Sequence, residues 1–275
     1  MPATKTPLRF PGGKTKLYKY VTKSMWEQSP KCTTYIEPFA GGAGIAMKLL
    51  LGKEVEHIII NDIDRSIYSI WKLILSDNDE LASFIQSVPL TIDEWRKQKE
   101  IVTHQTDYDD CELGLASFFM NRTNVSGIIS GGPIGGTRQN SKYKIDARFN
   151  RDGLLRKINE IKKEKSRVRL YNMDAAKLIE TVIKKIDASS SFVYFDPPYV
   201  NKGPLLYENY YKKEDHENLA TQIQKLNRPW LVTYDDCEFI RNLYRNQTIE
   251  QIEISYSAGK TRKGSEMAIK RHKEQ

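Results

Sequence analysis

The N-terminal part of the chain carries short apolar runs separated by a cluster of glycines. Residues 33–37 (TTYIE) are predicted to form a strand, the glycines at 41–44 a turn, residues 45–51 a helix, and residues 57–60 (HIII) a second, buried strand. Strand, turn, helix and strand in this order form a βαβ unit, which places two parallel strands in one sheet covered by helices. The pattern therefore predicts an α/β fold.

The last third of the chain returns to the same pattern. Residues 168–171 and 192–195 are predicted strands, residues 215–226 a helix, and residues 230–234 a further strand. The run at 192–195 (FVYF) is continuously apolar, which is typical of a strand buried on both faces. These elements are expected to complete the sheet that the N-terminal part begins.

The middle of the chain interrupts this sheet. It carries long polar-apolar patterns at helical spacing, followed by a glycine-rich stretch and a basic block. At 275 residues the chain fits one large domain or a core with an inserted lobe. We predict a sheet domain made of residues 1–75 and 166–275, and an inserted, mainly helical lobe at 76–165.

The composition fits a globular protein with a sizeable core, since 39% of the residues are hydrophobic and 10% are aromatic. The three cysteines form no C-x-x-C pair and the four histidines show no metal-ligand spacing, so neither a disulfide framework nor a metal site is predicted. The N-terminus lacks the apolar core of a signal peptide, and no run approaches the roughly 18 apolar residues of a membrane span. We expect a cytoplasmic protein without a membrane partner.

Positive charge is concentrated in one block. The chain has 43 basic and 35 acidic residues, a net charge of +8. Residues 138–169 contain twelve Lys or Arg and four Asp or Glu, so this block alone has a balance of +8. A polyanionic partner is one explanation, and the solvated face of an amphipathic helix at 154–165 is the alternative. Lys260, Arg262 and Lys263, in a predicted hairpin, add positive charge on a second side.

The glycine turn and Asp62 are candidates for cofactor binding. A glycine-rich turn lets the backbone approach a ligand. Asp62 lies 21 residues after Gly41, the expected position for a carboxylate that accepts hydrogen bonds from both hydroxyls of a ribose. Glu37 precedes the turn and would repel a pyrophosphate, so a cationic ligand group is favoured. Together these features indicate an adenosine-bearing cofactor. The alternative is that the glycines allow close helix-to-sheet packing and Asp62 caps a helix.

Residues 11–15 (PGGKT) invite comparison with a phosphate-binding loop. That motif, G-x-x-x-x-G-K-[ST], requires a glycine at position 8, where this chain has Leu8. The comparison fails at this position, and an ATPase function fails with it. A plain N-terminal turn is the alternative for this segment.

The tetrapeptide at 196–199 (DPPY) follows a predicted buried strand, at the edge where open α/β sheets bind ligands. Its two prolines have no N–H, so the backbone there offers only acceptors. The Asp196 carboxylate and a peptide carbonyl suit an amino group with two N–H donors, and Tyr199 offers a flat face for stacking on a planar base. The alternative is a Pro-Pro turn with a capping aspartate.

Five segments in this order identify a family: FPGGK at 10–14, EPFAGGAG at 37–44, NDID at 61–64, DPPY at 196–199 and AGKTRKGSEM at 258–267. The chain resembles the Dam-like family of adenine-specific DNA methyltransferases over nearly its whole length, including FMNR and Gly127 in the insert. The resemblance implies a Rossmann-like S-adenosylmethionine-dependent methyltransferase sheet with an inserted, mainly helical DNA-recognition lobe. It also implies an enzyme that flips an adenine out of double-stranded DNA and transfers a methyl group directly to its exocyclic nitrogen.

The resemblance assigns site residues by their positions in these motifs. The S-adenosylmethionine pocket is implied to contain Phe10, Gly13, Lys14, Glu37, Pro38, Phe39, Gly41, Gly42, Asp62, Asp174 and Asp196. The catalytic motif is implied to be Asp196, Pro197, Pro198 and Tyr199. The aspartate and the following prolyl carbonyl would hold the target amine, and the aromatic ring would stack on the extruded base. The residues implied to bind DNA are Asn121, Arg122, Asn124, Arg138, Lys142, Lys144, Lys260 and Arg262.

The recognition region departs from relatives that are specific for GATC. Thr123 stands where they carry an aromatic residue, and residues 138–149 match them poorly, so the recognised sequence is left open. The alternatives are RNA adenine or protein glutamine methyltransferases, which generally have Asn in place of Asp196, and a catalytically inactive DNA-binding relative, which the intact motifs disfavour. We expect a monomer that acts on double-stranded DNA, with a cognate restriction endonuclease as a candidate partner.

Overall fold

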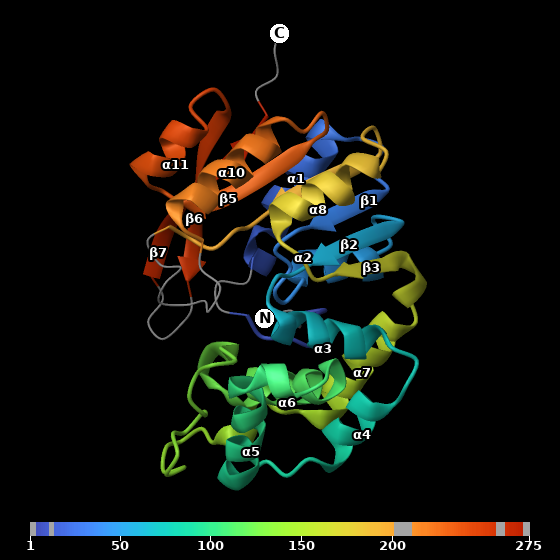
Figure 1. The fold of residues 1–275 in the computed structure, drawn as a ribbon, viewed down its shortest axis with the longest axis vertical. Coiled ribbons are helices and arrows are strands. Elements are labelled where there is room, and N and C mark those ends of the chain that lie inside the picture. The colour runs from blue at the N-terminus through green and yellow to red at the C-terminus, as the bar shows by residue number, and fades with distance from the viewer. Residues whose placement is uncertain (1–3, 11–13, 201–210, 257–261, 272–275) are drawn as a thin grey trace.

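A seven-stranded sheet forms the centre of the computed structural model, which describes residues 4–10, 14–200, 211–256 and 262–271 (Figure 1). The strand order is β3-β2-β1-β4-β5-β7-β6. The strands are β1 (Thr34–Glu37), β2 (His57–Asn61), β3 (Val168–Tyr171), β4 (Ser191–Phe195), β5 (Trp230–Asp235), β6 (Thr248–Tyr256) and β7 (Arg262–Lys270). Strands β1 to β5 are parallel, whereas β7 runs antiparallel between β5 and β6. The predicted α/β fold and the predicted C-terminal hairpin are both confirmed.

Helices cover both faces of this sheet. They are α1 (Tyr18–Gln28), α2 (Gly44–Leu51), α3 (Arg65–Leu75), α4 (Glu80–Ser87), α5 (Ile92–Thr103), α6 (Asp110–Thr123), α7 (Arg151–Lys162), α8 (Ala175–Thr181), α10 (Lys213–Gln224) and α11 (Glu238–Leu243). Helices α1, α2 and α3 pack in one core cluster, and α8, α10 and α11 pack in a second. In the described parts of the chain, no helix is long and apolar enough to cross a bilayer.

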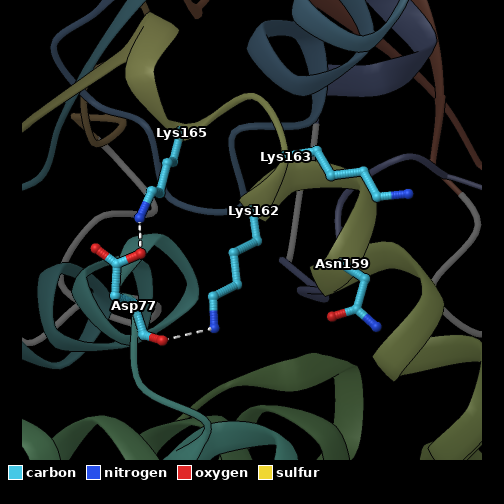
Figure 2. A pocket seen from close by; sticks show the side chains of 5 residues that line it. All are labelled: Asp77, Asn159, Lys162, Lys163 and Lys165. Carbon is cyan, nitrogen blue, oxygen red and sulfur yellow. Dashed lines mark hydrogen bonds and ion pairs between the residues drawn. The ribbon is translucent and has the colours of Figure 1, made fainter.

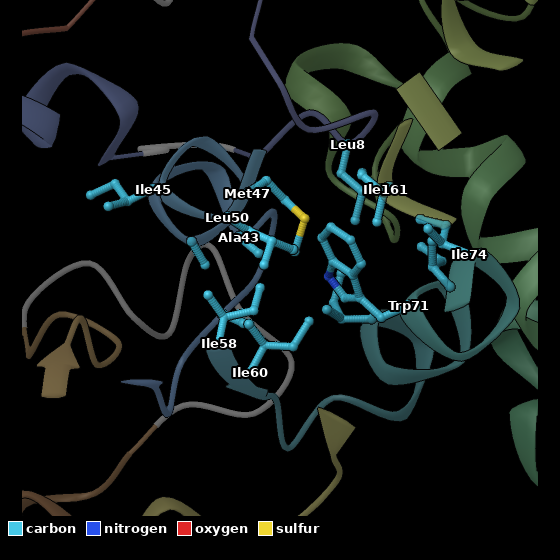
Figure 3. Close-up of a cluster of buried hydrophobic side chains, with 14 of the residues drawn as sticks. Leu8, Ala43, Ile45, Met47, Leu50, Ile58, Ile60, Trp71, Ile74 and Ile161 are labelled. Carbon is cyan, nitrogen blue, oxygen red and sulfur yellow. The ribbon is translucent and has the colours of Figure 1, made fainter. Parts of the chain in front are cut away.

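Strand β2 shows why its sequence is apolar without alternation. Ile58 and Ile60 belong to the first core cluster, whereas Ile59 between them belongs to the second. Successive side chains of a strand point to opposite faces, and here both faces are covered by helices. Figure 3 shows Ile58 and Ile60 facing Met47 of α2 and Trp71 of α3. The run of three isoleucines at 58–60 is therefore a consequence of burial on two sides.

The insert forms a helical lobe below the sheet in the view of Figure 1. Helix α6 packs against α3, and Gly114 permits this close approach, because a Cβ there would lie 2.7 Å from the Ser69 carbonyl oxygen. The first core cluster continues from the sheet into the lobe through Trp71, Phe119 and Ile161. The division into a sheet domain and an inserted lobe stays a prediction, since the two share this core.

Helix α7 begins and ends three residues earlier than the expected range of 154–165. It begins early because the Asn150 side chain accepts a hydrogen bond from the Gly153 N–H at 2.9 Å, a side-chain cap that satisfies a first-turn donor. After α7 the chain forms a short 3₁₀ turn (Lys165–Arg167) that leads into β3. Strand β3 has the predicted bounds.

Candidate active site

The carboxyl ends of β1 and β4 lie side by side, because these strands are neighbours in the sheet. From β1 the sheet continues to β2 and β3 on one side, and from β4 it continues to β5 on the other. Open α/β sheets bind ligands at the point where the strand order reverses in this way. The EPF segment that begins at Glu37 and the DPPY segment that begins at Asp196 therefore meet at one edge.

Four polar side chains converge beside the end of β4. The Lys14 ammonium lies 2.9 Å from both carboxylate oxygens of Glu266 on β7 and 3.3 Å from Asp196 Oδ1. The Tyr199 hydroxyl hydrogen-bonds with Lys14 and with Glu266, and the ammonium lies 4.6 Å from the centre of the Tyr199 ring. Lys14, Asp196, Tyr199 and Glu266 are called the carboxylate cluster below. The structure thus brings together three residues that the motifs predicted and adds Glu266.

The hydroxyl of Thr233 on β5 is the second group that contacts Asp196. Its Oγ1 donates to Asp196 Oδ1 at 2.8 Å. Glu266 lies within the motif at 258–267, which predicts no role for it, and no sequence motif points to Thr233. Each is a polar residue within an otherwise apolar, buried strand segment, EMAI and WLVTY respectively. Since buried polar groups require partners, that contrast was the available signal.

Burial dominates the electrostatics of this edge. Burial raises the pKa of Asp196, and the nearby Lys14 ammonium opposes that rise. Burial acting alone would lower the pKa of Lys14, but the charges of Asp196 and Glu266 outweigh it and the pKa of Lys14 is raised. The pKa of Glu37 is raised to about 8, chiefly by burial. Asp196 and Glu266 thus share the single positive charge of Lys14, and this excess of negative charge favours a cationic ligand.

The glycine turn is held from three sides. The ring of Phe10 lies against Gly41, where an added Cβ would come within 2.8 Å of the ring and where φ is +45°. The Gly41 N–H donates to Asp62 Oδ2 at 2.8 Å, and the Trp71 indole donates to the Gly41 carbonyl at 2.9 Å. Any side chain at position 41 would therefore displace Phe10.

Asp62 supports this turn and does not cap the following helix. Its Oδ1 accepts from the Asp64 N–H at 3.0 Å, and it is Asp64 that caps α3 by accepting from the Ser66 N–H at 2.8 Å. Burial, and then the neighbouring charge of Asp64, raise the pKa of Asp62 to about 7. The helix-cap alternative for Asp62 is thereby wrong, whereas its predicted contact with a ribose stays a prediction.

Asp174 lies at the end of β3 and caps α8. Its carboxylate accepts from the Ala176 and Lys177 N–H groups and from the Tyr211 hydroxyl, the last at 3.0 Å. The Tyr211 ring packs edge-on against Phe39, with 5.7 Å between ring centres. Asp174 and Phe39 are therefore linked through one tyrosine, while their predicted contacts with the cofactor are untested.

Two asparagines predicted to bind DNA are buried in the lobe. The Asn121 side chain accepts from the Arg9 N–H and donates to the carbonyls of Arg9 and Gly127. The Asn124 side chain accepts from the Trp95 indole and donates to two carbonyls of the following loop. Both asparagines are fully buried. In this structure their polar atoms hold the N-terminal segment and the glycine-rich loop, and their predicted contact with DNA stays a prediction.

Arg122 is partly buried and lies among other cations. Its guanidinium donates to the carbonyls of Pro7 and Arg148. Burial, and then the charges of Arg9 and Arg148, lower the pKa of Arg122 to about 9. Arg9 also donates to the Asn124 carbonyl at 2.8 Å. These guanidinium groups donate to carbonyl oxygens, which carry no net charge and so do not neutralise them.

The basic block divides into two parts. Arg138, Lys142 and Lys144, in the loop before α7, are exposed. In contrast, Lys162 and Lys165 contact Asp77, and Lys162 also pairs with Asp79 at 3.1 Å. Figure 2 shows the two contacts with Asp77 in a surface hollow that Asn159 and Lys163 also line. Lys162 and Lys165 are therefore paired within the protein, whereas the solvated-helix alternative for the block stays untested.

Three predicted positions have limited description. Gly13 and Lys260 lie outside the described residues. Arg262 begins β7, and only its backbone is described. Their predicted contacts with cofactor or DNA remain predictions.

The fold and the site define a class of protein. The sheet has seven strands, one of them antiparallel, and an acidic edge at its switch point. This architecture is typical of the Rossmann-like S-adenosylmethionine-dependent methyltransferases. Within that class, the model of the D12 class N6 adenine-specific DNA methyltransferase family matches residues 10–258. The chain belongs to this family and is thus an adenine-specific DNA methyltransferase; the family uses S-adenosylmethionine in general.

Individual relatives agree with this membership. The type II methyltransferase M.MjaIII of Methanocaldococcus jannaschii is 27% identical over 274 residues, which cover 89% of each chain. The retron Ec67 DNA adenine methylase of Escherichia coli is 21% identical over 276 residues, covering 95% of this chain and 90% of the relative. Among solved structures, the rRNA methyltransferase AviRa of Streptomyces viridochromogenes is similar with a TM-score of 0.44 and 10% identity, covering 98% of this chain and 93% of that one. That structural likeness is too distant to bear on the substrate.

Proposed function

We propose that this protein methylates the exocyclic nitrogen of an adenine flipped out of double-stranded DNA, and that residues 196–199 hold that base. The observation that carries the proposal is the position of Asp196 at the switch point of the sheet. Its side chain is 23% exposed, so a substrate amine can reach it, while its backbone is fixed at the end of β4. Family membership supports adenine as the base and DNA as the polymer.

The target amine needs acceptors on one side and a planar surface against its ring. The Asp196 carboxylate and the Pro197 carbonyl supply two acceptors, and neither Pro197 nor Pro198 has a competing N–H. Tyr199 supplies the ring, whose hydroxyl end is anchored by Lys14 and Glu266. An amine held in this way has its lone pair directed out of the acceptor plane, which favours attack on an aligned methyl group.

The residues at this edge fit S-adenosylmethionine by their chemistry. Burial raises the pKa values of Glu37 and Asp196, and a positively charged ligand group beside them would lower these pKa values again, so the two carboxyl groups would ionise and bind it. Asp62, Asp174 and the exposed Ile63 lie beyond the ends of β2 and β3 and suit the adenosine part. When bound, S-adenosylmethionine supplies an electrophilic methyl group. The protein positions the amine and carries the negative charge that faces the reacting centre.

Two groups of cations suit the DNA backbone. Arg138, Lys142 and Lys144 project from the glycine-rich loop of the lobe. Arg9 and Arg122 lie where the N-terminal segment crosses the lobe, next to the Phe10 that covers the glycine turn. Phosphate contacts supply most of the sequence-independent affinity for DNA. We therefore assign the first group to the duplex and the second to the strand nearest the extruded base.

The test is the identity of the methylated nucleoside. The protein is incubated with isotope-labelled S-adenosylmethionine and either duplex DNA or structured RNA, and the polymer is digested and analysed by mass spectrometry. We expect label on the exocyclic nitrogen of adenine, and in DNA rather than RNA. Label mainly on cytosine, or transfer to RNA in preference to DNA, would overturn the proposal. A mapped set of modified sites in the same DNA would also give the recognised sequence.

A further inference from the structure

Two buried hydroxyl groups lie behind Asp196 and form a hydrogen-bonded chain with it. The hydroxyl of Tyr194 on β4 is 2.9 Å from Thr233 Oγ1 on β5, and Thr233 Oγ1 is 2.8 Å from Asp196 Oδ1. Tyr194 is 3% exposed and Thr233 is fully buried. Adjacent parallel strands bring these side chains together, since the residues of β4 and β5 pair from Val193 to Phe195. The chain therefore connects the sheet interior to the residue that faces the substrate.

The number of available protons determines which group donates and which accepts in each of these hydrogen bonds. An ionised carboxylate only accepts, so the single hydrogen of the Thr233 hydroxyl is donated to Asp196. The Thr233 oxygen can then only accept from the Tyr194 hydroxyl. Tyr194 itself stays protonated, because burial raises its pKa well above the ordinary value. Each bond in such a chain polarises the next, which strengthens the final bond to the carboxylate.

The contacts of Asp196 are unequal between its two oxygens. Thr233 Oγ1 and the Lys14 ammonium both lie within reach of Oδ1, at 2.8 Å and 3.3 Å. A carboxylate fixed by one oxygen from behind presents the other oxygen in a defined plane. That plane decides whether the second oxygen meets an amine at hydrogen-bond geometry.

We propose that Thr233 is a positioning residue for methyl transfer, and that its hydroxyl, oriented by Tyr194, fixes Asp196 Oδ1 so that Oδ2 receives the target amine. The inference rests on the proposed role of Asp196 as the amine acceptor. Thr233 touches neither substrate nor cofactor in this scheme and acts only through Asp196. It gives β5, to which no motif assigned a role, a part in orienting the reactive group.

Several ionisable groups face Asp196 and set the background for a pH test. They are Lys14 from η1 (Lys14–Leu17), Tyr35 and Glu37 from β1, Tyr194 from β4, Tyr199 from the segment after β4, and Glu266 from β7. Among the effects on Asp196, Lys14 and the Thr233 hydrogen bond lower its pKa, whereas burial and Glu266 raise it. Removing the Thr233 hydroxyl therefore moves the pKa of Asp196 upward.

The experiment compares Thr233→Val, which keeps the shape of the side chain, with Thr233→Ser, which keeps the hydroxyl. Thr233→Val is expected to lower kcat by about ten- to a hundredfold, the typical effect of losing a hydrogen bond to a charged group, and to move the acidic limb of the kcat profile to higher pH. Thr233→Ser is expected to restore both. The titration of the Asp196 carboxyl, followed by NMR of isotope-labelled protein without ligands, should move in the same direction as the kinetic limb.

Two further variants make the test specific. Tyr194→Phe removes only the far hydroxyl, so it should shift the limb in the same direction by less, and adding it to Thr233→Val should change nothing more, since the chain is already broken. Thr22→Val is the matched control, because Thr22 is buried but donates to a helix carbonyl. It should leave both the kcat and the pH limb unchanged.

The outcomes separate this proposal from the proposed function. Near-normal kcat in Thr233→Val, or a loss that is equal at every pH with an unmoved Asp196 titration, overturns the positioning role. If Thr233→Val does not fold, an unmoved limb in Tyr194→Phe overturns it instead. Absence of labelled adenine with the unsubstituted protein contradicts the proposed function itself, before any variant is compared.

Discussion

The catalytic edge of the sheet and the glycine-rich loop of the lobe hold charge in different surroundings. At the edge, the Lys14 side chain is 9% exposed and pairs with Glu266, which is 1% exposed. In the loop, Lys142 and Lys144 are exposed to solvent. A buried charge is tolerated only when it is paired and hydrogen-bonded, whereas an exposed cation keeps its hydration until a phosphate replaces it.

This difference predicts which region of the protein is more sensitive to substitution. At the edge each group fixes its neighbours, so one substitution should disturb geometry, pKa values and the transfer step together. In the loop the cations act as separate charges, so their effects should be small, roughly additive and dependent on salt. The four predictions below test this contrast, from the largest expected effect to the smallest.

The largest effect is expected from Asp196→Ala. The variant loses the carboxylate that is proposed to hold the target amine, so methyl transfer should fall by at least about a thousandfold. DNA affinity should change little, because the variant leaves the exposed cations of the loop unchanged. Filter binding beside a labelled-methyl transfer assay measures both. Asp236→Ala, at a surface aspartate paired with Arg241, is the control. Near-normal turnover in Asp196→Ala would contradict the role of Asp196 as the acceptor of the target amine.

The raised pKa of Glu37 should make the free energy of unfolding depend on pH. Its folded pKa is about 8, above its ordinary value of 4.5, so the folded state holds this proton more tightly than the unfolded state. The free energy of unfolding should therefore fall as the pH rises from about 5 to about 8. Glu37→Gln keeps the acceptor for Tyr35 and should remove this component, gaining about 2 kcal/mol or more at pH 8. Denaturant unfolding without ligands measures it, and parallel pH curves for the two proteins would contradict it.

Glu266→Gln should act on the transfer step without removing an acceptor of the amine. Lys14 then has Asp196 as its remaining charged partner in the carboxylate cluster, which weakens Asp196 as an acceptor, so kcat should fall by about tenfold. Because Glu266 raises the pKa of Asp196, its removal should move the acidic limb of kcat to lower pH, opposite to Thr233→Val. Glu250→Gln, at a more exposed glutamate paired with Lys270, is the control. A limb that moves upward would contradict the geometry of the cluster.

The smallest effect is expected from single neutralisations in the loop. Lys144→Gln should reduce the slope of log K against log salt by about 0.9, the value for one lost phosphate contact, and leave kcat at saturating DNA unchanged. Lys163→Gln removes the same charge from the hollow of Figure 2 and should leave the slope unchanged. Equal slopes for both variants would place the DNA elsewhere on the surface.

The sequence was informative wherever a local pattern determined the structure. The βαβ unit, the bounds of β3 and the C-terminal hairpin follow from apolar runs and turns, and the structure agrees with each. The meeting of Glu37 with Asp196 was also predictable, since carboxyl ends of neighbouring parallel strands share an edge. The structural roles of Asn121 and Asn124 were not predictable, because nothing in the local sequence distinguishes a buried amide from one that contacts DNA.

The sequence by itself determined the class of sheet, the family and the residues at the switch point, because strand periodicity and short motifs are properties of neighbouring residues. Only the tertiary structure decided which polar groups surround Asp196. Lys14, Thr233 and Glu266 come from η1, β5 and β7, far apart in the chain, and their meeting depends on the strand order and on the antiparallel insertion of β7. A charge can be recognised in a sequence, but its partner and its burial are settled only when the chain has folded around it.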